Sequence, residues 1–256
     1  MKTRQMGALV VVELKKLYRD PMTLAVLLLM PVGLTLIFYL ALGGVSSDSY
    51  YYPVPGMTHF EYLLPGVMGY AVIYMGMMVA LALCEYRQSG LLNRIEITPV
   101  SPAVYLGSHI VANMVIATVQ GLIVLLLARL LGYVPLGGPV GLLLAALFLA
   151  VLAVAVVGLG LITASVAKDS GAAGGLSVIF IVPMMMFGAL LAVFNETTRT
   201  VAKFTPNYYV SDSLSVIFHQ GSVSDLVVWQ NLLILALISL VSIVVGIWLF
   251  RKIGYR

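Results

Sequence analysis

Residues 140–166 read VGLLLAALFLAVLAVAVVGLGLITASV, and this stretch decides the fold class of the chain. It contains no charged side chain. An α-helix rises 1.5 Å per residue, so about 20 apolar residues are needed to cross a hydrocarbon core of about 30 Å. The stretch therefore has both the length and the composition of a membrane-spanning helix.

The composition of the whole chain points the same way. Of its 256 residues, 61% are hydrophobic and 9% are charged, whereas soluble domains contain about 45–50% apolar and about 25% charged residues. These values exclude a water-soluble globule, a disordered chain and a strongly nucleic-acid-binding protein. The net charge of +4 comes from small groups of Lys and Arg between apolar runs, so no nucleic-acid partner is expected.

Six apolar runs in the sequence are long enough to span a membrane, and they lack the alternation of β-barrel strands. The first run exceeds the 7–15 apolar residues typical of a cleaved signal peptide, so we expect it to be retained. We predict an all-α membrane protein with a single transmembrane domain over residues 1–256: an interfacial helix in 1–21, a six-span bundle in 22–250 and a cytoplasmic tail in 251–256. The predicted spans are Met22–Gly43, Tyr62–Leu83, Gly107–Leu131, Val140–Val166, Gly171–Phe194 and Leu226–Phe250.

Helix-start signals agree with these boundaries. Asp20-Pro21 and Ser101-Pro102 each combine an N-cap residue with Pro at the first helical position. Ser222 and Asp225 have the spacing of a capping box before the last span. Thr205-Pro206 repeats the cap-plus-Pro signal inside the last long loop, which predicts a short outer-side helix over residues 207–218.

The distribution of Lys and Arg predicts the orientation, because cytoplasmic segments carry an excess of these residues. Eleven fall on one side of the predicted bundle and three on the other, which places both termini of this multi-pass protein in the cytoplasm and the protein in the plasma membrane. The larger group is Lys2, Arg4, Lys15, Lys16, Arg19, Arg87, Arg94, Lys168, Arg251, Lys252 and Arg256; the smaller is Arg129, Arg199 and Lys203.

The predicted spans contain no Asp, Glu or Lys, and the one Arg, Arg129, is close to an outer end. Ion-coupled transporters keep such residues at mid-membrane, so the energy for transport is expected to come from outside this chain. No Gly-Lys dipeptide is present, hence no phosphate-binding P-loop. His59, His109 and His219 lack metal-ligand spacing and Cys84 is the only cysteine, so we expect neither metal, cofactor nor enzymatic site in this chain.

The third predicted span carries a polar stripe. At 100° per residue, His109, Asn113 and Gln120 fall within about 40° of one another. Interhelical hydrogen bonding is the favoured interpretation, and lining of a transport pathway is the alternative. Pro31 and Pro183 lie inside the first and fifth spans, where each removes a backbone hydrogen bond and is expected to bend the helix.

Residues 4–19 form an amphipathic pattern at helical spacing, with Met6, Val10, Val11, Leu14, Leu17 and Tyr18 in one sector. We interpret it as a helix on the inner membrane surface, with its cations near anionic lipid. The alternative is a charge cluster that only sets topology.

The connection between spans two and three is the most distinctive polar segment: residues 85–99 read EYRQSGLLNRIEITP. Leu91, Leu92 and Ile95 share one face of a short helix, and Thr98 before Pro99 should end it. Such a helix is suited to act as a lever for a cytoplasmic partner, and an ordinary solvated connection is the alternative.

The order Glu85, Gly90, Leu91, Thr98-Pro99-Val100-Ser101 and then Leu106-Gly107 resembles the membrane subunit of ATP-binding-cassette exporters of the ABC type 2 permease family. The resemblance covers nearly the whole chain. The Asn207-Tyr208 to Asp212 segment is similar to the family's Asn-Pro-x-x-Tyr stretch, although here Pro206 precedes the Asn.

The resemblance implies two copies that pair into a twelve-span pathway, with two separate ATPase subunits docked beneath, where ATP and Mg bind. Spans two and five are expected to border the pathway, and residues 195–224 to shape its outer gate. The residues expected to couple to the ATPase are Glu85, Arg87, Gln88, Ser89, Gly90, Leu91, Leu92, Asn93, Arg94, Ile95, Glu96, Thr98 and Pro99.

The leading functional hypothesis is therefore ATP-driven export by this chain together with its ATPase partner. The alternative is a non-transporting membrane anchor or scaffold for a cytoplasmic ATPase. A mostly neutral interior with Met and aromatic residues favours hydrophobic or amphipathic cargo such as drugs or lipids, and polysaccharide or peptide cargo is the alternative.

Overall fold

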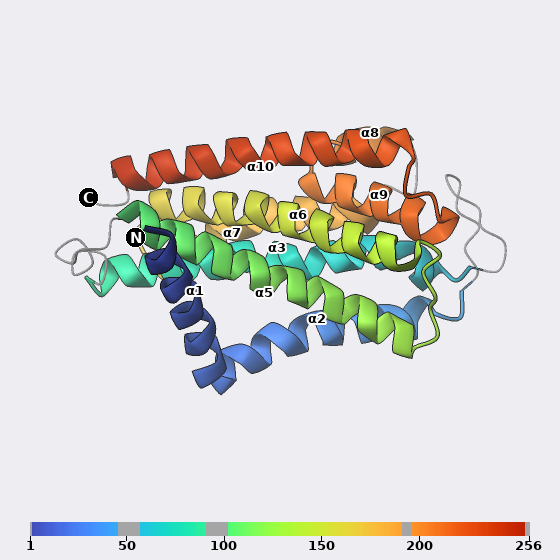
Figure 1. Cartoon of the computed structure of the whole chain (residues 1–256), viewed down its shortest axis with the longest axis horizontal. Coiled ribbons are helices and arrows are strands. Elements are labelled where there is room, and N and C mark those ends of the chain that lie inside the picture. The colour runs from blue at the N-terminus through green and yellow to red at the C-terminus, as the bar shows by residue number, and fades with distance from the viewer. Residues whose placement is uncertain (1, 46–56, 91–101, 191–195, 254–256) are drawn as a thin grey trace.

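The computed structural model describes residues 2–45, 57–90, 102–190 and 196–253. These residues form helices and connecting turns, and no β-strand occurs among them, which confirms the all-α prediction. Most helices lie side by side along the long axis of the molecule (Figure 1). Their bounds are α1 Lys2–Arg19, α2 Pro21–Leu42, α3 His59–Gln88, α5 Pro102–Leu130, α6 Gly138–Val166, α7 Ser170–Met185, the π-helical turn η1 Met186–Leu190, α8 Glu196–Ala202, α9 Pro206–Gln220 and α10 Leu226–Ile253.

Six of the described helices are long and apolar enough to cross a membrane, as predicted. The second predicted span is too short at both ends, because α3 begins at His59 and continues to Gln88. The predicted end of the fifth span, Phe194, lies outside the described residues. The six candidate spans are Pro21–Leu42, His59–Gln88, Gly107–Leu130, Gly138–Val166, Ser170–Gly188 and Leu226–Phe250.

The start of α2 confirms the predicted cap at Asp20. Its carboxylate accepts hydrogen bonds from the backbone N–H of Thr23 at 3.1 Å and from the Thr23 hydroxyl at 2.6 Å. The first of these bonds satisfies a backbone donor that has no partner inside the helix. Pro102 begins α5 as predicted, while its expected cap, Ser101, lies outside the described residues.

The capping box predicted at Ser222 is wrong. The helix begins only at Leu226, and the carboxylate of Asp225 accepts the N–H of Val227 at 2.9 Å. Asp225 is therefore the cap itself, because it directly precedes the first free donors. A complete capping box is found instead at the start of α3, between Thr58 and Glu61.

The centre of the bundle is α3. The helix is 72% buried over its most apolar window, against 17% for α2, 28% for α7 and 22% for α10. It packs against α5, α6, α7 and α9. Its approach to α6 depends on glycine, because a Cβ on Gly160 would meet the carbonyl oxygen of Gly76. Small residues at such a contact allow helix backbones to come close together in a membrane.

Both chain termini lie at one end of the bundle (Figure 1), which we call the terminal end; the opposite end is the far end. The only two Trp residues of the chain, Trp229 and Trp248, lie on α10 and are 47% and 57% exposed. Their separation along the helix is about 28 Å at 1.5 Å per residue. This matches the thickness of a bilayer core, at whose two surfaces Trp is enriched.

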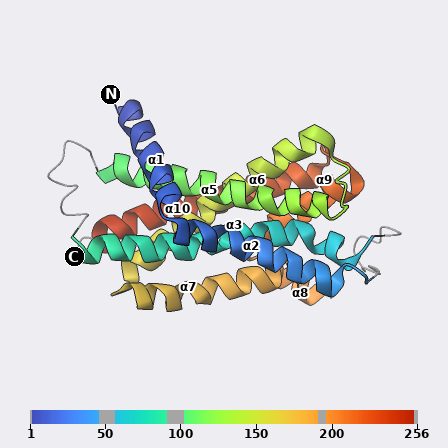
Figure 2. The same ribbon diagram turned by 90° about the horizontal axis from the view of Figure 1, so that it is seen from below.

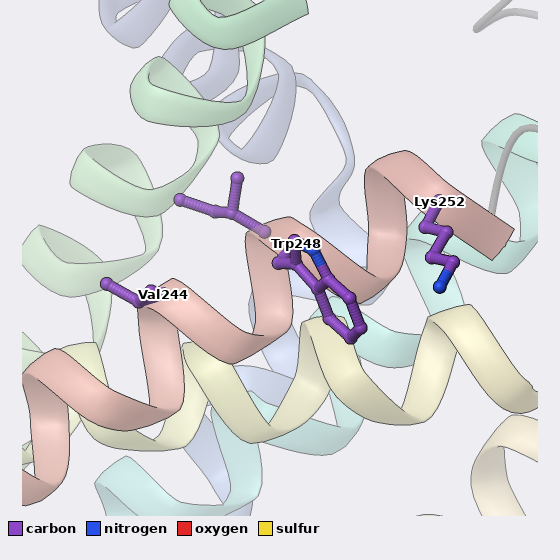
Figure 3. A pocket seen from close by; sticks show the side chains of 4 residues that line it. Val244, Trp248 and Lys252 are labelled. Carbon is purple, nitrogen blue, oxygen red and sulfur yellow. The ribbon is translucent and has the colours of Figure 1, made fainter.

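Near the terminal end of α10, Val244, Ile247, Trp248 and Lys252 line a hollow on the surface (Figure 3). The Lys252 ammonium lies 4.9 Å from the centroid of the Trp248 ring. A cation over an aromatic ring at this position is typical of a helix end that leaves the hydrocarbon core.

The helix α1 runs across the bundle axis instead of along it (Figures 1 and 2). It packs mainly against α5. Of its predicted apolar sector, Leu14 and Leu17 are half-buried, whereas Val11 and Tyr18 are exposed. The helix therefore has one apolar face against the bundle and further apolar side chains pointing away from it. Its location on the inner membrane surface stays a prediction.

Candidate functional site

The last turn of α3 carries the first residues of the predicted coupling segment. Glu85, Arg87 and Gln88 are helical, so the segment begins as a direct continuation of the second span. Gly90 then adopts φ +68°, a left-handed conformation that commonly ends helices and that glycine adopts without strain. The remaining residues expected to couple lie outside the described residues: Leu91, Leu92, Asn93, Arg94, Ile95, Glu96, Thr98 and Pro99.

Arg87 binds the end of α6. Its guanidinium donates to the carbonyl oxygens of Ala164 at 3.2 Å and Lys168 at 3.3 Å, and also to that of Ala167. The last carbonyls of a helix lack partners within it and carry the negative end of the helix dipole, so a cation is favoured there. The sequence predicted that Arg87 contacts a partner. In the structure its side chain is bonded to carbonyl oxygens of the same chain.

Tyr86 joins α3 to α1. The Lys16 ammonium donates to the Tyr86 hydroxyl and lies 4.4 Å from the centroid of its ring. Burial acts to lower the pKa of Lys16, but the bond to Tyr86 and the nearby carboxylates outweigh it and raise the pKa. The end of α3 is thus attached both to α1 through Tyr86 and to the α6–α7 turn through Arg87.

A cavity of about 310 Å³ lies beside this junction, between α1, α2, α3 and α5; we call it the terminal-end cavity. Its polar lining comprises Glu13, Lys16, Asp20, Thr23, Glu85, Tyr86, His109 and Asn113. Burial raises the pKa of Glu13 although the nearby Lys16 opposes the shift. The Glu13 carboxylate lies 4.0 Å from Nδ1 of His109.

The structure separates the members of the predicted polar stripe. Gln120 donates from Nε2 to the carbonyl oxygen of Leu27 on α2 at 2.6 Å, an interhelical hydrogen bond as the favoured interpretation expected. Asn113 donates within its own helix to the carbonyl of His109 at 2.8 Å. His109 and Asn113 line the terminal-end cavity and Gln120 does not.

At the far end, α9 is the short helix predicted in the last loop, but it is a buried part of the bundle (Figure 1). Asn207, in its first turn, fits between Gly69 of α3 and Gly188 of η1, where any Cβ would collide with the Asn207 side chain. His219, in its last turn, bonds through Nε2 to the carbonyl of Glu61 at 3.1 Å. From Asn207 to His219 along α9, the contacts on α3 move back from Gly69 to Glu61, a distance of more than two turns. The two helices are therefore antiparallel, and α9 enters the bundle.

A polar network fixes α9 to its neighbours. Asp212 lies 3.5 Å from the Arg199 guanidinium of α8 and accepts from Asn231 of α10 at 2.9 Å. Arg199 also donates to the Tyr208 hydroxyl at 3.1 Å. This network was not predicted from the sequence. Its only local signal is that Tyr208 and Asp212, four residues apart, share one face of the helix.

A family model described as ABC-2 family transporter protein matches residues 44–248, which extend from before α3 almost to the end of α10. No curated protein matches the chain.

Proposed function

This chain belongs to the ABC-2 family of transporter proteins, and we propose that it is the membrane subunit of an exporter driven by ATP. Membership makes it a permease subunit, a transport component that associates with an ABC ATPase. The proposal adds that ATP is bound and hydrolysed on that separate subunit, that residues 85–99 receive its motion, and that transport is outward.

The observation that carries the proposal is the double attachment of the last turn of α3. Arg87 binds the end of α6 and Tyr86 binds Lys16 of α1. A displacement of the segment that follows Gly90 therefore acts on three helices together instead of being absorbed at a loose helix end. ATP shifts the conformational equilibrium only if the ATPase makes different contacts with this segment in the two states.

We further propose that a second copy of the chain completes the pathway, packed against α2 and α7. These helices are among the least buried of the six candidate spans. The equally exposed α10 carries Trp229 and Trp248, which suits a helix that faces lipid. The exposed faces of α2 and α7 are apolar, with Leu29, Ile37 and Ile179 among their exposed side chains.

The proposed cargo is hydrophobic or amphipathic, such as a drug or a lipid, because the six candidate spans consist mostly of neutral side chains and include Met and aromatic residues. The proposed orientation puts both termini in the cytoplasm of a plasma-membrane protein. It is supported by the excess of Lys and Arg at the terminal end of the bundle, including Lys16, Arg87 and Lys252.

The test uses the purified chain in complex with its ATPase, reconstituted into proteoliposomes. Replacing Leu91, Leu92 and Ile95 by Asp should abolish cargo-stimulated ATP hydrolysis without affecting membrane insertion, because the apolar face that meets the ATPase is lost. Val134→Asp, at an exposed position of the far end, is the control for an added charge. Unchanged stimulation in the triple variant contradicts the coupling role, and ATP turnover insensitive to all candidate cargo favours the scaffold alternative.

A further inference from the structure

The terminal-end cavity has the size and lining of a ligand site. Its volume of about 310 Å³ is at the lower limit of the roughly 300–1,000 Å³ found for small-molecule sites. One part of the wall is apolar, with Leu27, Met75, Met78 and Ile116, and the other carries the charged and polar side chains described above. Met side chains adapt to ligands of different shape because they are flexible and polarisable.

The charges at the cavity are predominantly negative. Glu13, Asp20 and Glu85 contribute carboxylates, and Lys16 contributes the one cation among the described lining residues. Lys16 is already bonded to Tyr86, and Asp20 caps α2 through Thr23. One of the three N–H groups of Lys16 is therefore already used by Tyr86, whereas the carboxylate of Glu13 accepts no hydrogen bond within the described part of the chain.

His109 is the second observation that indicates a missing occupant. The residue is 5% exposed, and neither ring nitrogen has a hydrogen-bond partner among the described residues. Buried polar atoms almost always have a partner, so those that lack one require an explanation. The Glu13 carboxylate lies only 4.0 Å from His109 Nδ1. An ammonium nitrogen carries up to three N–H groups, so one placed beside Glu13 can donate to the carboxylate. It can also donate to the unprotonated nitrogen of His109 once that ring, whose nitrogens are covered by neighbouring atoms, turns toward it.

The wall of the cavity already holds one ammonium group. Lys16 lies over the Tyr86 ring and bonds to its hydroxyl, so the aromatic ring and nearby carboxylates have the chemistry that binds a cation. A negatively charged or purely apolar ligand would leave the Glu13 carboxylate and the unprotonated nitrogen of His109 without a donor.

We propose that the terminal-end cavity binds a hydrophobic ammonium compound, with its charged nitrogen at Glu13 and His109 and its hydrocarbon part against Leu27, Met75 and Met78. The identification of this ligand as cargo that enters from the inner leaflet rests on the proposed export function. Binding itself depends only on this chain, so the two are tested separately.

The experiment measures equilibrium binding of radiolabelled dodecylammonium to the full chain in phosphatidylcholine nanodiscs, with empty nanodiscs as background. Dodecanol and dodecyl sulfate have the same alkyl chain but a neutral and a negative head group. Only dodecylammonium should bind saturably. Glu13→Gln should weaken its binding about tenfold, as expected for loss of a charged hydrogen bond. Lys16→Met should strengthen it, because a competing cation is removed.

Three further variants keep the test independent of folding defects. Glu196→Gln makes the same charge change on an exposed residue of α8 and should leave binding unchanged. Glu13→Asp keeps the carboxylate and should retain more affinity than Glu13→Gln. Ala82→Phe, at a position that lines the cavity, changes no charge but fills the space and should abolish saturable binding in chains that remain monodisperse.

Equal affinity of wild type, Glu13→Gln and Ala82→Phe would overturn the proposal, as would saturable binding of dodecanol with the same affinity as dodecylammonium. Weaker saturable binding of dodecyl sulfate in Lys16→Met, together with its stronger binding in Glu13→Gln, would overturn the proposal and identify an anion site instead. The variant in which Leu91, Leu92 and Ile95 are replaced by Asp should keep dodecylammonium binding while ATP coupling is lost. A failure of the export proposal therefore has a different signature from a failure of the binding site.

Discussion

Replacement of Arg87 by Met tests whether the end of α3 is fixed to α6. The change removes the guanidinium that serves the carbonyls of Ala164, Ala167 and Lys168. A hydrogen bond from a charged donor contributes about 1.5–3 kcal/mol, and a cation at a helix C-terminus about 0.3–1 kcal/mol. Arg87 is half-exposed, so water takes over part of these interactions. We expect a net local loss of about 2 kcal/mol.

Cys84 provides a built-in probe of this loss. It is the only cysteine of the chain, it is buried, and its thiol lies 3.7 Å from the carbonyl oxygen of Ala164. A thiol reagent reaches it only when the packing around it opens, and Arg87 belongs to that packing, because its guanidinium lies 3.9 Å from the Cys84 sulfur. If closing is fast relative to labelling, the rate follows the population of the open form. A loss of about 2 kcal/mol then corresponds to labelling about 30-fold faster.

Two controls define the result. Arg87→Lys keeps the charge but not the forked donor, so its Cys84 labelling rate should lie between those of wild type and Arg87→Met. Arg199→Met makes the same substitution at the far end and should leave the rate unchanged. If Cys84 in a folded Arg87→Met variant reacts as slowly as in wild type, Arg87 does not hold the two helices together, and the argument for force transmission through this contact is wrong.

Three other predictions concern helix packing and the pH dependence of stability. Gln120→Leu should lower the free energy of unfolding by about 1–3 kcal/mol by leaving a buried carbonyl without a donor, and Pro31→Ala should offset most of this loss in a double-mutant cycle of thermal unfolding. Gly69→Ala should cost about 1–3 kcal/mol through overpacking, whereas Gly175→Ala, which meets no atom within 4 Å, should stabilise α7 slightly. Because burial raises the pKa of Glu13 from its ordinary 4.5, ionisation opposes docking of α1 at neutral pH. Glu13→Gln should therefore raise the melting temperature there, and the gain should disappear as the pH falls below about 4.5, where the carboxyl is protonated in both folded and unfolded states.

The spans could be predicted because a membrane-spanning helix requires a simple sequence pattern. Each must supply about 20 apolar residues, and each backbone group must be satisfied within the helix. The cap at Asp20 followed from the same local rules. The polar extension of α3 to Gln88 was not predicted, because hydropathy marks where the apolar run ends and not where the helix ends.

The contacts of the candidate site were less accessible to prediction. Arg87 was assigned to a partner because it lies in a polar connection, yet its guanidinium meets carbonyls of α6 that are distant in sequence. The network at Asp212 was missed for the same reason, because it joins side chains of three different helices. Hydropathy and helical spacing report which residues share a face of one helix, but they do not report which helix packs against that face.

Prolines inside the spans are an exception, because each one identifies from the sequence a carbonyl that has no donor within its own helix. Pro31 has no N–H to offer the carbonyl of Leu27 four residues earlier, and Gln120 donates to that carbonyl. Pro65 leaves the carbonyl of Glu61 free in the same way, and His219 bonds to it. A freed carbonyl in an apolar interior needs a donor. A polar side chain in a neighbouring helix should therefore be considered first as that donor, and only then as part of a pathway. By that criterion Gln120 and His219 are packing residues, whereas His109, which has no such carbonyl to serve, keeps its place in the binding proposal.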